Sequence, residues 1–352
     1  MSTIYIRTLK KADHTVFGVE DGQKRYYDPQ FNKYVPYSSG QQIKRSLIDK
    51  LTSVLNEIPA PTTFVFSANK AGELKEDEVF ANCNPSFADQ LLGGWMKAAK
   101  GGKERTIKRR SPLSISAMRG LHPLLSGIDK ENASFDRSDR PNNNVIVRDE
   151  KGNEMNEEEI IALLQGKDRS LSRKWIPDQR RANGLYVQDI AIDLRRLFCV
   201  SLNTFEPEIT PDTEKLLRES GWIESKNVFG KCLVAPPVIR EKLIPALAHA
   251  ILNWSITSNQ SRTFSLMETL AVSISDNANK IAGSIRAKLS FEDENKAIPI
   301  IEEDLKGVES FVTLQAGGYI LTKKESTNAL DNAEAKLIEL MKAFDYMNQI
   351  AI

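Results

Sequence analysis

Hydrophobic positions recur at helical spacing in three segments of the chain. In residues 41–56, Ile43, Leu47 and Leu51 fall on one helical face, and residues 238–254 and 326–348 show the same period. We predict a helix in each. Short runs of β-branched and aromatic residues predict strands at 4–6, 16–19, 24–27, 64–66, 111–118, 184–194, 270–275 and 284–291. Two alternating runs of opposite phase within 184–194 predict a bulge near Asp189.

The order of these elements predicts an α+β fold. Strand, helix, strand, strand, helix and strand follow one another, which is the ferredoxin-like βαββαβ pattern that RRM domains use to present RNA. Long excursions interrupt it, and a compact domain does not normally leave so much loop idle. We divide the chain into 1–59 (palm, first part), 60–183 (insertion with one palm strand near 111–118), 184–198 (palm strand), 199–236 (smaller excursion) and 237–352 (palm, second part, with the C-terminal helix).

The start of the first helix combines hydroxyl groups with cations. Ser38 or Ser39 can cap the free amides of the first turn. Lys44 and Arg45 follow, where the positive end of the helix dipole opposes them. Such a turn suits a phosphate backbone, although an ordinary capped surface helix with two solvated cations has the same local pattern.

Overall composition is that of a globular protein and does not by itself indicate a nucleic-acid partner. The 352 residues are 41% hydrophobic and 27% charged, and 48 basic residues nearly balance 47 acidic ones. The three cysteines are far apart in sequence, which predicts neither a disulfide framework nor a zinc site. No signal-peptide pattern and no apolar run long enough for a membrane span is present, so we expect a cytoplasmic protein without a membrane partner.

The distribution of charge is more informative than its sum. Residues 97–119 contain eight cations and a single acid, Glu104, and residues 167–181 are basic again around Trp175. Each cation in such a cluster can neutralise one phosphate, and an exposed tryptophan can stack on a base. Solvated basic loops have the same composition. The candidates for lining a nucleic-acid groove are Arg109, Arg110, Arg119, Arg173 and Lys174.

Catalytic chemistry has little support in the sequence. The three histidines, His14, His122 and His249, stand apart from one another and from any cysteine or carboxylate pattern typical of a triad or a metal site. The turn before the first helix, residues 34–42, contains no acid, and no glycine-rich phosphate loop is present. We therefore expect no catalytic residues, no metal and no cofactor.

The segment Ser38-Ser39-Gly40-Gln41-Gln42-Ile43-Lys44-Arg45-Ser46 resembles a known family. Together with the preceding strand it is similar to the first strand–turn–helix of the backbone subunit of Cascade-type CRISPR effector complexes, within the RAMP superfamily. The layout agrees: a long insertion follows the first helix, a smaller excursion follows the central strand, and a polar loop precedes the final palm strand. The resemblance covers residues 1–56 and 184–291 most clearly.

This resemblance implies an RRM-like palm with a web or finger insertion in 60–183 and a thumb in 199–236. Copies of such a subunit polymerise along a CRISPR guide RNA, together with other effector subunits, and present the guide for pairing with target nucleic acid. The acidic composition of residues 203–225 departs from a simple RNA-binding thumb. The positions that match the family's RNA-gripping turn and palm loop are Ser38, Ser39, Gln41, Gln42, Lys44, Arg45, Asn259, Gln260 and Arg262.

Two alternatives remain at this stage. Related RAMP proteins include ribonucleases that process guide precursors or cut target RNA, and a general RRM-like RNA-binding protein has the same strand and helix order.

Overall fold

The computed structural model describes residues 1–18, 23–68, 72–99, 105–136, 145–166, 173–256 and 264–350. For residues 131–136 and 173–179 it describes the backbone alone. The predicted loop residues Asn259, Gln260 and Arg262 lie outside these ranges.

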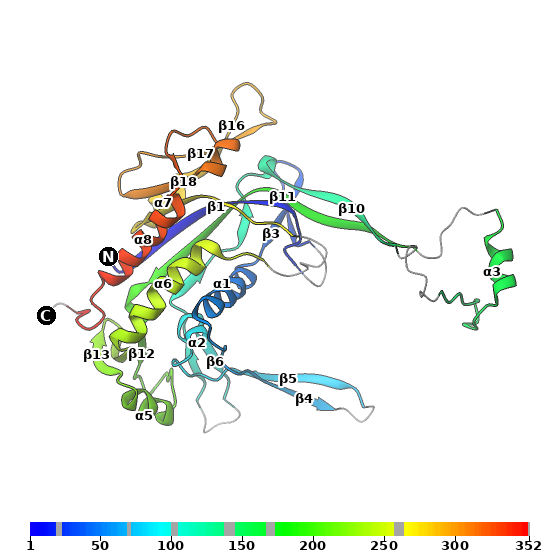
Figure 1. Cartoon of the computed structure of the whole chain (residues 1–352). Coiled ribbons are helices and arrows are strands. Elements are labelled where there is room, and N and C mark those ends of the chain that lie inside the picture. Colours follow the sequence, from blue (N-terminus) through cyan, green and yellow to red (C-terminus); the bar gives the residue numbers. More distant parts are fainter. Residues whose placement is uncertain are drawn as a thin grey trace.

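A large sheet forms the centre of the molecule (Figure 1). Its strand order is β19-β18-β15-β1-β11-β9-β3-β2, and β8 and β10 also pair with β11. The central neighbours β15, β1, β11 and β9 are all antiparallel. The strands are β1 (Thr3–Thr15), β2 (Arg25–Asp28), β3 (Lys33–Ser38), β8 (Leu113–Ile115), β9 (Met118–Gly120), β10 (Ser126–Asp136), β11 (Arg173–Asp193), β15 (Thr269–Ser275), β18 (Val308–Thr313) and β19 (Glu325–Ser326).

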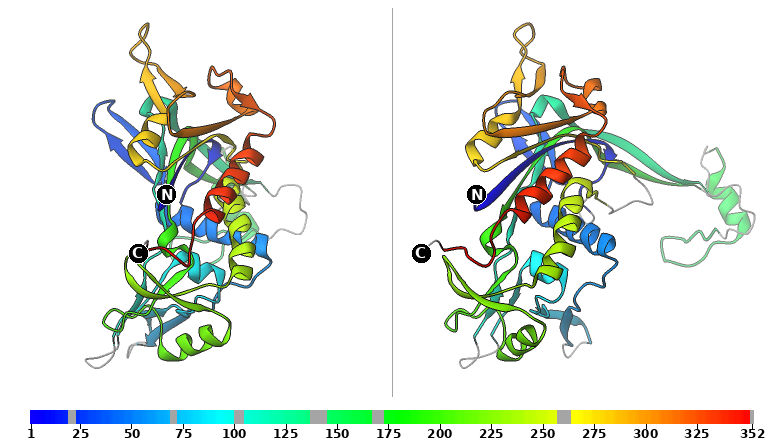
Figure 2. Two further views of the ribbon diagram at one scale, coloured as in Figure 1. Left: turned by 90° about the vertical axis from the view of Figure 1, so that its left-hand side faces the viewer. Right: turned by 60° about the vertical axis from the view of Figure 1, so that its left-hand side comes forward.

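One face of this sheet is covered by three helices, and the main hydrophobic core lies between them and the strands. The helices are α1 (Gly40–Leu55), α6 (Pro237–Asn253) and α8 (Ala329–Lys342), and Figure 2 shows α6 and α8 beside the sheet. Even-numbered residues of β1 point into this core, because side chains alternate along a strand; Ile4 and Ile6 are at most 1% exposed. A mixed structure with a large sheet confirms the α+β class.

Most predicted elements are present, with differences at their ends. The helix predicted at 326–348 ends at Lys342, and beyond it the Asp345 carboxylate accepts backbone N–H bonds from Met347 and Asn348 in a local turn. The strand predicted at 16–19 is not formed in its described part, 16–18, because β1 continues to Thr15.

The bulge expected near Asp189 lies in the neighbouring segment instead. Pairing of β1 with β11 runs without a shift from Thr3 opposite Asp193 to Ala12 opposite Gly184. On its other side β11 meets Ile115 at Ile190 and Arg119 at Val187, so the 115–119 segment holds the extra residue. The two apolar runs within 184–194 alternate in opposite phase because β11 is buried on both faces. Val187 on one face is 4% exposed and Ile190 on the other is 2% exposed.

The opposite face of the sheet carries a smaller layer. A second core there joins Leu9 and Leu185 to side chains from 270–320. The strand predicted at 284–291 lies in this layer as β16, and within the described ranges it pairs with β17 and not with the central sheet. The elements are α7 (Ala278–Ser284), β16 (Ile285–Leu289), β17 (Ala297–Ile301) and the 3₁₀ helix η2 (Leu314–Gly318).

Parts of residues 60–183 and residues 199–236 project from this body (Figure 1). A hairpin of β4 and β5 and the long β10–β11 arm extend toward the same side. Residues 199–236 form a three-stranded sheet with one helix. The elements are β4 (Thr63–Ala68), β5 (Leu74–Phe80), α2 (Ala88–Gly93), β6 (Trp95–Lys97), β7 (Ile107–Arg109), η1 (Pro123–Leu125), α3 (Glu157–Leu164), α4 (Leu194–Leu197), β12 (Cys199–Ser201), α5 (Pro211–Glu219), β13 (Ile223–Asn227) and β14 (Gly230–Val234).

A buried lysine joins β1 to the end of α6. The Lys10 ammonium donates a 2.8 Å hydrogen bond to the Thr269 hydroxyl and lies 4.8 Å from the centre of the Trp254 ring. Burial lowers the pKa of Lys10 to about 7, because the charged form is poorly solvated there.

No helix among the described residues is long and apolar enough to cross a membrane.

Candidate nucleic-acid interface

The turn that opens α1 has the predicted capped geometry. The Ser39 hydroxyl accepts the N–H of Gln42 at 3.4 Å, and the Ser38 hydroxyl donates to the Gln42 side-chain oxygen at 3.1 Å. Gly40 is required at the first position of the helix, because an added Cβ would lie 2.5 Å from the Ile115 carbonyl oxygen. The helix start is therefore seated directly on the bulged segment between β8 and β9.

Two of the predicted RNA-binding cations are used inside the protein. The Lys44 ammonium donates to the Gly93 carbonyl at 2.6 Å, and the Arg109 guanidinium donates to the Leu91 carbonyl. Both carbonyls belong to the end of α2, where backbone acceptors lack helical partners and cations are favoured. Burial lowers the pKa of Lys44 and lowers that of Arg109 to about 10.

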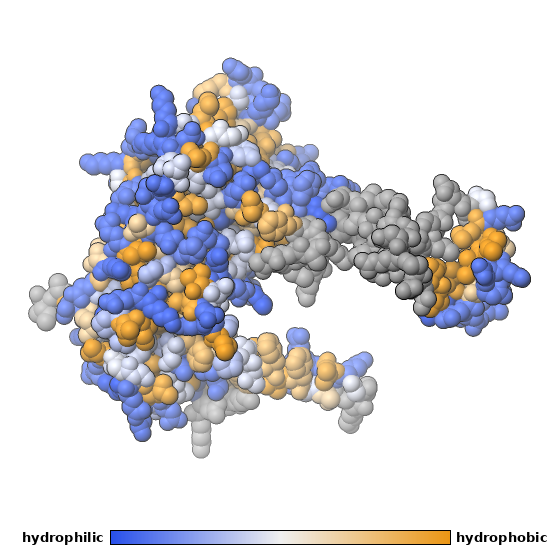
Figure 3. All heavy atoms as spheres, in the orientation of Figure 1, coloured by the Kyte–Doolittle hydropathy of each residue, from blue (hydrophilic) through white to orange (hydrophobic). Residues whose placement is uncertain are grey.

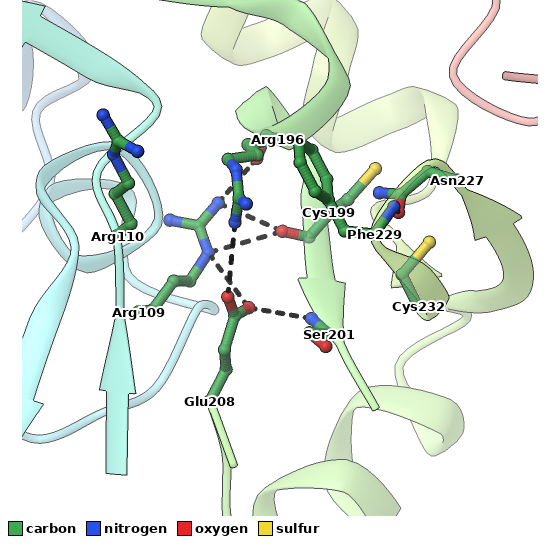
Figure 4. Close-up of a pocket in the computed structure, with 9 residues that line it drawn as sticks. All are labelled: Arg109, Arg110, Arg196, Cys199, Ser201, Glu208, Asn227, Phe229 and Cys232. Carbon is green, nitrogen blue, oxygen red and sulfur yellow. Dashed lines mark hydrogen bonds and ion pairs between the residues drawn. The ribbon is translucent and has the colours of Figure 1, made fainter. Parts of the chain in front are cut away.

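Arg109 lies in the interior, next to the half-buried carboxylate of Glu208 (Figure 4). Its side chain is 1% exposed, 3.8 Å from Glu208, and it also donates to the carbonyls of Arg196 and Cys199. Arg196 approaches the same carboxylate at 3.9 Å, whereas Arg110 lies apart from this group. The opening here measures about 20 Å³, enough for one water molecule and too small for a phosphate. The structure thus assigns Arg109 to internal packing and not to the surface of a groove.

Of the other predicted residues of the α1 turn, Ser38 is fully buried and Ser39 and Gln42 are half-buried, so the accessible ones are Gln41 and Arg45. Gln41 is exposed, and the Arg45 side chain is 85% exposed with Asp49 at 3.8 Å. An exposed pair of this kind contributes at most about 1 kcal/mol, so the guanidinium can exchange its partner at little cost.

Arg119 faces the side of the sheet opposite the helices. Its side chain is 55% exposed and lies 4.0 Å from Asp189, which Arg7 holds through two hydrogen bonds of 2.6 and 2.9 Å. Tyr37 of β3 is the direct neighbour of Arg119 across the strands. The buried Arg7 is therefore committed to Asp189, while Arg119 keeps a large accessible surface. Sequence reasoning named Arg119 but missed its neighbours: Asp189 stands in the strand predicted at 184–194, whereas Arg7 lies one residue beyond the strand predicted at 4–6.

Two further predicted cations, Arg173 and Lys174, are described only through their backbones. Arg173 and Lys174 pair through their backbones with Asp136 and Phe135 at the outer end of the β10–β11 arm. Among the described residues no group of three or more histidine, cysteine, aspartate or glutamate side chains is arranged to hold a metal.

Two histidines have local contacts instead. His249 lies 3.1 Å from Glu334 and links α6 to α8. His122 accepts the N–H of Leu124 at the start of η1, and burial lowers its pKa.

The β4–β5 hairpin presents an apolar face that the sequence analysis did not identify. Phe64 lies opposite Val79, and Phe66 follows on the same face, since alternate residues of a strand share a side. Their exposed fractions are 62%, 60% and 51%, and Leu74 near the tip is 75% exposed. Figure 3 shows this hydrophobic surface along the projecting hairpin. Phe64, Val65 and Phe66 form a continuous apolar run, which does not indicate by itself which of its side chains are exposed.

Comparison with solved structures places this architecture in a known class. The chain is similar to a chain described as "CRISPR RNA-guided surveillance complex, pre-nicking", with a TM-score of 0.50 and 10% identity over 96% of this chain and all of that one. A second similar chain, from a "CRISPR RNA-guided surveillance complex", has a TM-score of 0.42 and 12% identity over 95% of this chain and 99% of its own. Comparison of the sequence with protein-family models and curated proteins gives no match.

The first of these comparisons shows that this chain shares its fold with a chain of an RNA-guided surveillance complex. The resemblance to Cascade-type complexes drawn from the sequence is confirmed at this level.

Proposed function

We propose that this protein is a non-catalytic guide-RNA-binding backbone subunit of a CRISPR surveillance complex. We further propose that β1, α1, β8 with β9, β11, α6 and β15 form a ferredoxin-like palm of the RAMP type. The antiparallel order β15-β1-β11-β9 supports this, because it is the order in which the strands of a βαββαβ unit lie.

The observation that carries the proposal is the start of α1. The Ser39-capped turn, exposed Gln41 and exposed Arg45 lie together at a helix N-terminus, where backbone N–H groups favour an anion. Lys44 supports this turn from within by tying α1 to the end of α2. The sugar–phosphate backbone of the guide RNA passes this turn in our proposal, and other effector subunits and a target strand join through the bound guide.

Copies of the chain associate along the RNA through the apolar face of the β4–β5 hairpin in our proposal. A two-stranded hairpin is marginally stable alone in water, and this one leaves Phe64, Phe66 and Val79 mostly exposed. Apolar area of this kind is typical of a protein–protein contact. A second copy bound to the same RNA is the partner that the proposed filament supplies.

RNA binding is tested by fluorescence anisotropy with a labelled guide RNA. Arg45→Glu should weaken binding about tenfold or more, because a phosphate-neutralising cation becomes a repelling anion. Lys50→Glu makes the same charge change later in α1 and should have a much smaller effect. Equal losses in both variants would show that the turn has no special role, and site-specific cleavage of the RNA would contradict the non-catalytic assignment.

Self-association is tested separately on a longer RNA. Phe64→Ser combined with Phe66→Ser should leave single bound copies where the wild type gives regular multiples in mass photometry. Val65→Ser, which changes the opposite face of β4, is the control. Multiples that persist in the double variant would contradict the proposed contact.

A further inference from the structure

The β2–β3 hairpin carries two exposed aromatic rings and a cation on one face. Tyr27 and Tyr34 lie directly opposite each other, with ring centres 5.4 Å apart at an interplanar angle of 60°. Their exposed fractions are 49% and 51%. The Arg25 guanidinium lies 4.3 Å from the centre of the Tyr34 ring, and Pro36 is opposite Arg25. This face therefore combines two rings with one positive charge.

The rings are not needed to attach the hairpin to the body. Val35 on the other face is fully buried, and the Lys33 ammonium donates to the carbonyls of Pro123 and Ser126 at 2.9 Å each. These contacts anchor the hairpin beside η1. About half of each tyrosine remains in water, where an apolar ring contributes nothing to the core.

The two rings lie on the same side of the sheet as the start of α1. Tyr34 and Ser38 are four residues apart on β3 and share a face, so about 13 Å separates them at the usual rise of a strand. Ser38 pairs with Met118, which is buried in the core on the helix side. The strand thus leads directly from the rings to the capped turn of α1.

We propose that Tyr27 and Tyr34, with Arg25, form a stacking site for bases of single-stranded RNA whose backbone continues onto the α1 turn. This inference rests on the proposed function, since it extends the same RNA path. Aromatic rings bind any base through its π-face, and an arginine adds a phosphate contact, so the site takes single-stranded RNA with little sequence preference. In this arrangement the α1 turn binds phosphate groups and the β2–β3 hairpin binds bases.

The test combines three variants with RNA carrying 2-aminopurine at successive positions. Tyr27→Leu with Tyr34→Leu keeps apolar bulk and removes both π-faces, and Tyr27→Phe with Tyr34→Phe keeps them. Phe291→Leu removes a ring that is 89% exposed elsewhere. We expect about tenfold weaker binding for the double leucine variant alone, with the salt dependence unchanged. Fluorescence of one or two positions should be quenched in the wild type and the phenylalanine variant, and recover with leucine.

The outcomes separate the two proposals. If the wild type binds guide RNA and the leucine and phenylalanine variants bind equally well, the stacking site is excluded and the proposed function stands. If the wild type does not bind the RNA, the proposed function fails and this inference fails with it. If the leucine variant is unfolded by circular dichroism, the pattern of quenching in the wild type decides, since a stacked base is quenched at fixed positions and an unstacked strand shows none.

Discussion

Lys44 and Arg45 are neighbours in the first turns of α1, yet they belong to two different environments. Lys44 turns inward with Arg109 and completes the end of α2, while Arg45 extends into water. In sequence, the pairs Lys44–Arg45 and Arg109–Arg110 both have the composition of a nucleic-acid site. The comparison shows that a buried cation next to backbone carbonyls holds the fold together, and that an exposed one beside a helix N-terminus remains available to a ligand.

Arg109→Met should give the largest effect on stability. It removes one of the two arginine partners of the half-buried Glu208 carboxylate and leaves the carbonyls of Leu91 and Cys199 without their charged donor, which typically costs about 3–5 kcal/mol. Urea denaturation measures the loss, and Arg110→Met, at an exposed position, should change stability by no more than about 0.5 kcal/mol. Similar effects of the two variants would remove the distinction between buried and exposed cations in this segment.

Lys10→Met sharpens the comparison through pH. The pKa of Lys10 is lowered from 10.5 to about 7 in the folded protein, so between these values the unfolded chain holds more protons. Wild-type stability should therefore rise with pH from about 7 to 10, by an amount on the order of 3 kcal/mol. The variant should lack this rise and be more stable at pH 6. Parallel pH profiles from thermal melts would contradict the burial of a charge at this position.

Lys44→Met and Arg45→Gln compare the neighbours directly. Lys44→Met should lower stability by about 1–2 kcal/mol, because the Gly93 carbonyl loses a charged donor. Arg45→Gln should be nearly neutral for stability and should weaken RNA binding. Chemical denaturation and anisotropy on the same samples measure both; a Lys44 variant that is stable but loses RNA would place that side chain at the ligand.

Arg119→Gln should give the smallest effect. If this cation contacts one phosphate, the slope of log affinity against log salt should decrease by about 0.7, with little change in stability. Anisotropy at several salt concentrations measures the slope. An unchanged slope would restrict the RNA path to the helix side of the sheet.

Local patterns predicted α1, α6 and α8, the capped turn and several strands of the central sheet, because these depend on spacing within a few residues. The destination of Lys44 was not readable, since the end of α2 reaches it from residue 93, far along the chain. The different environments of Arg109 and Arg110 had no local signal, because the strand was predicted only from residue 111. In the structure β7 ends at the buried Arg109, and the exposed Arg110 follows outside the strand. The exposed face of β4–β5 was missed because an apolar run is usually interpreted as core.

The 21-residue strand β11 belongs both to the centre of the sheet and to the projecting arm. At about 3.3 Å per residue it spans roughly 70 Å, so one continuous backbone connects the arm rigidly to the sheet. Its pairing with β10 shifts between Glu131 and Ala133, opposite the stretch that contains Pro177, which has no N–H to donate. The arm should bend most easily at this point. A force applied to the outer end of the arm would be transmitted along β11 and would twist the sheet near Asp189.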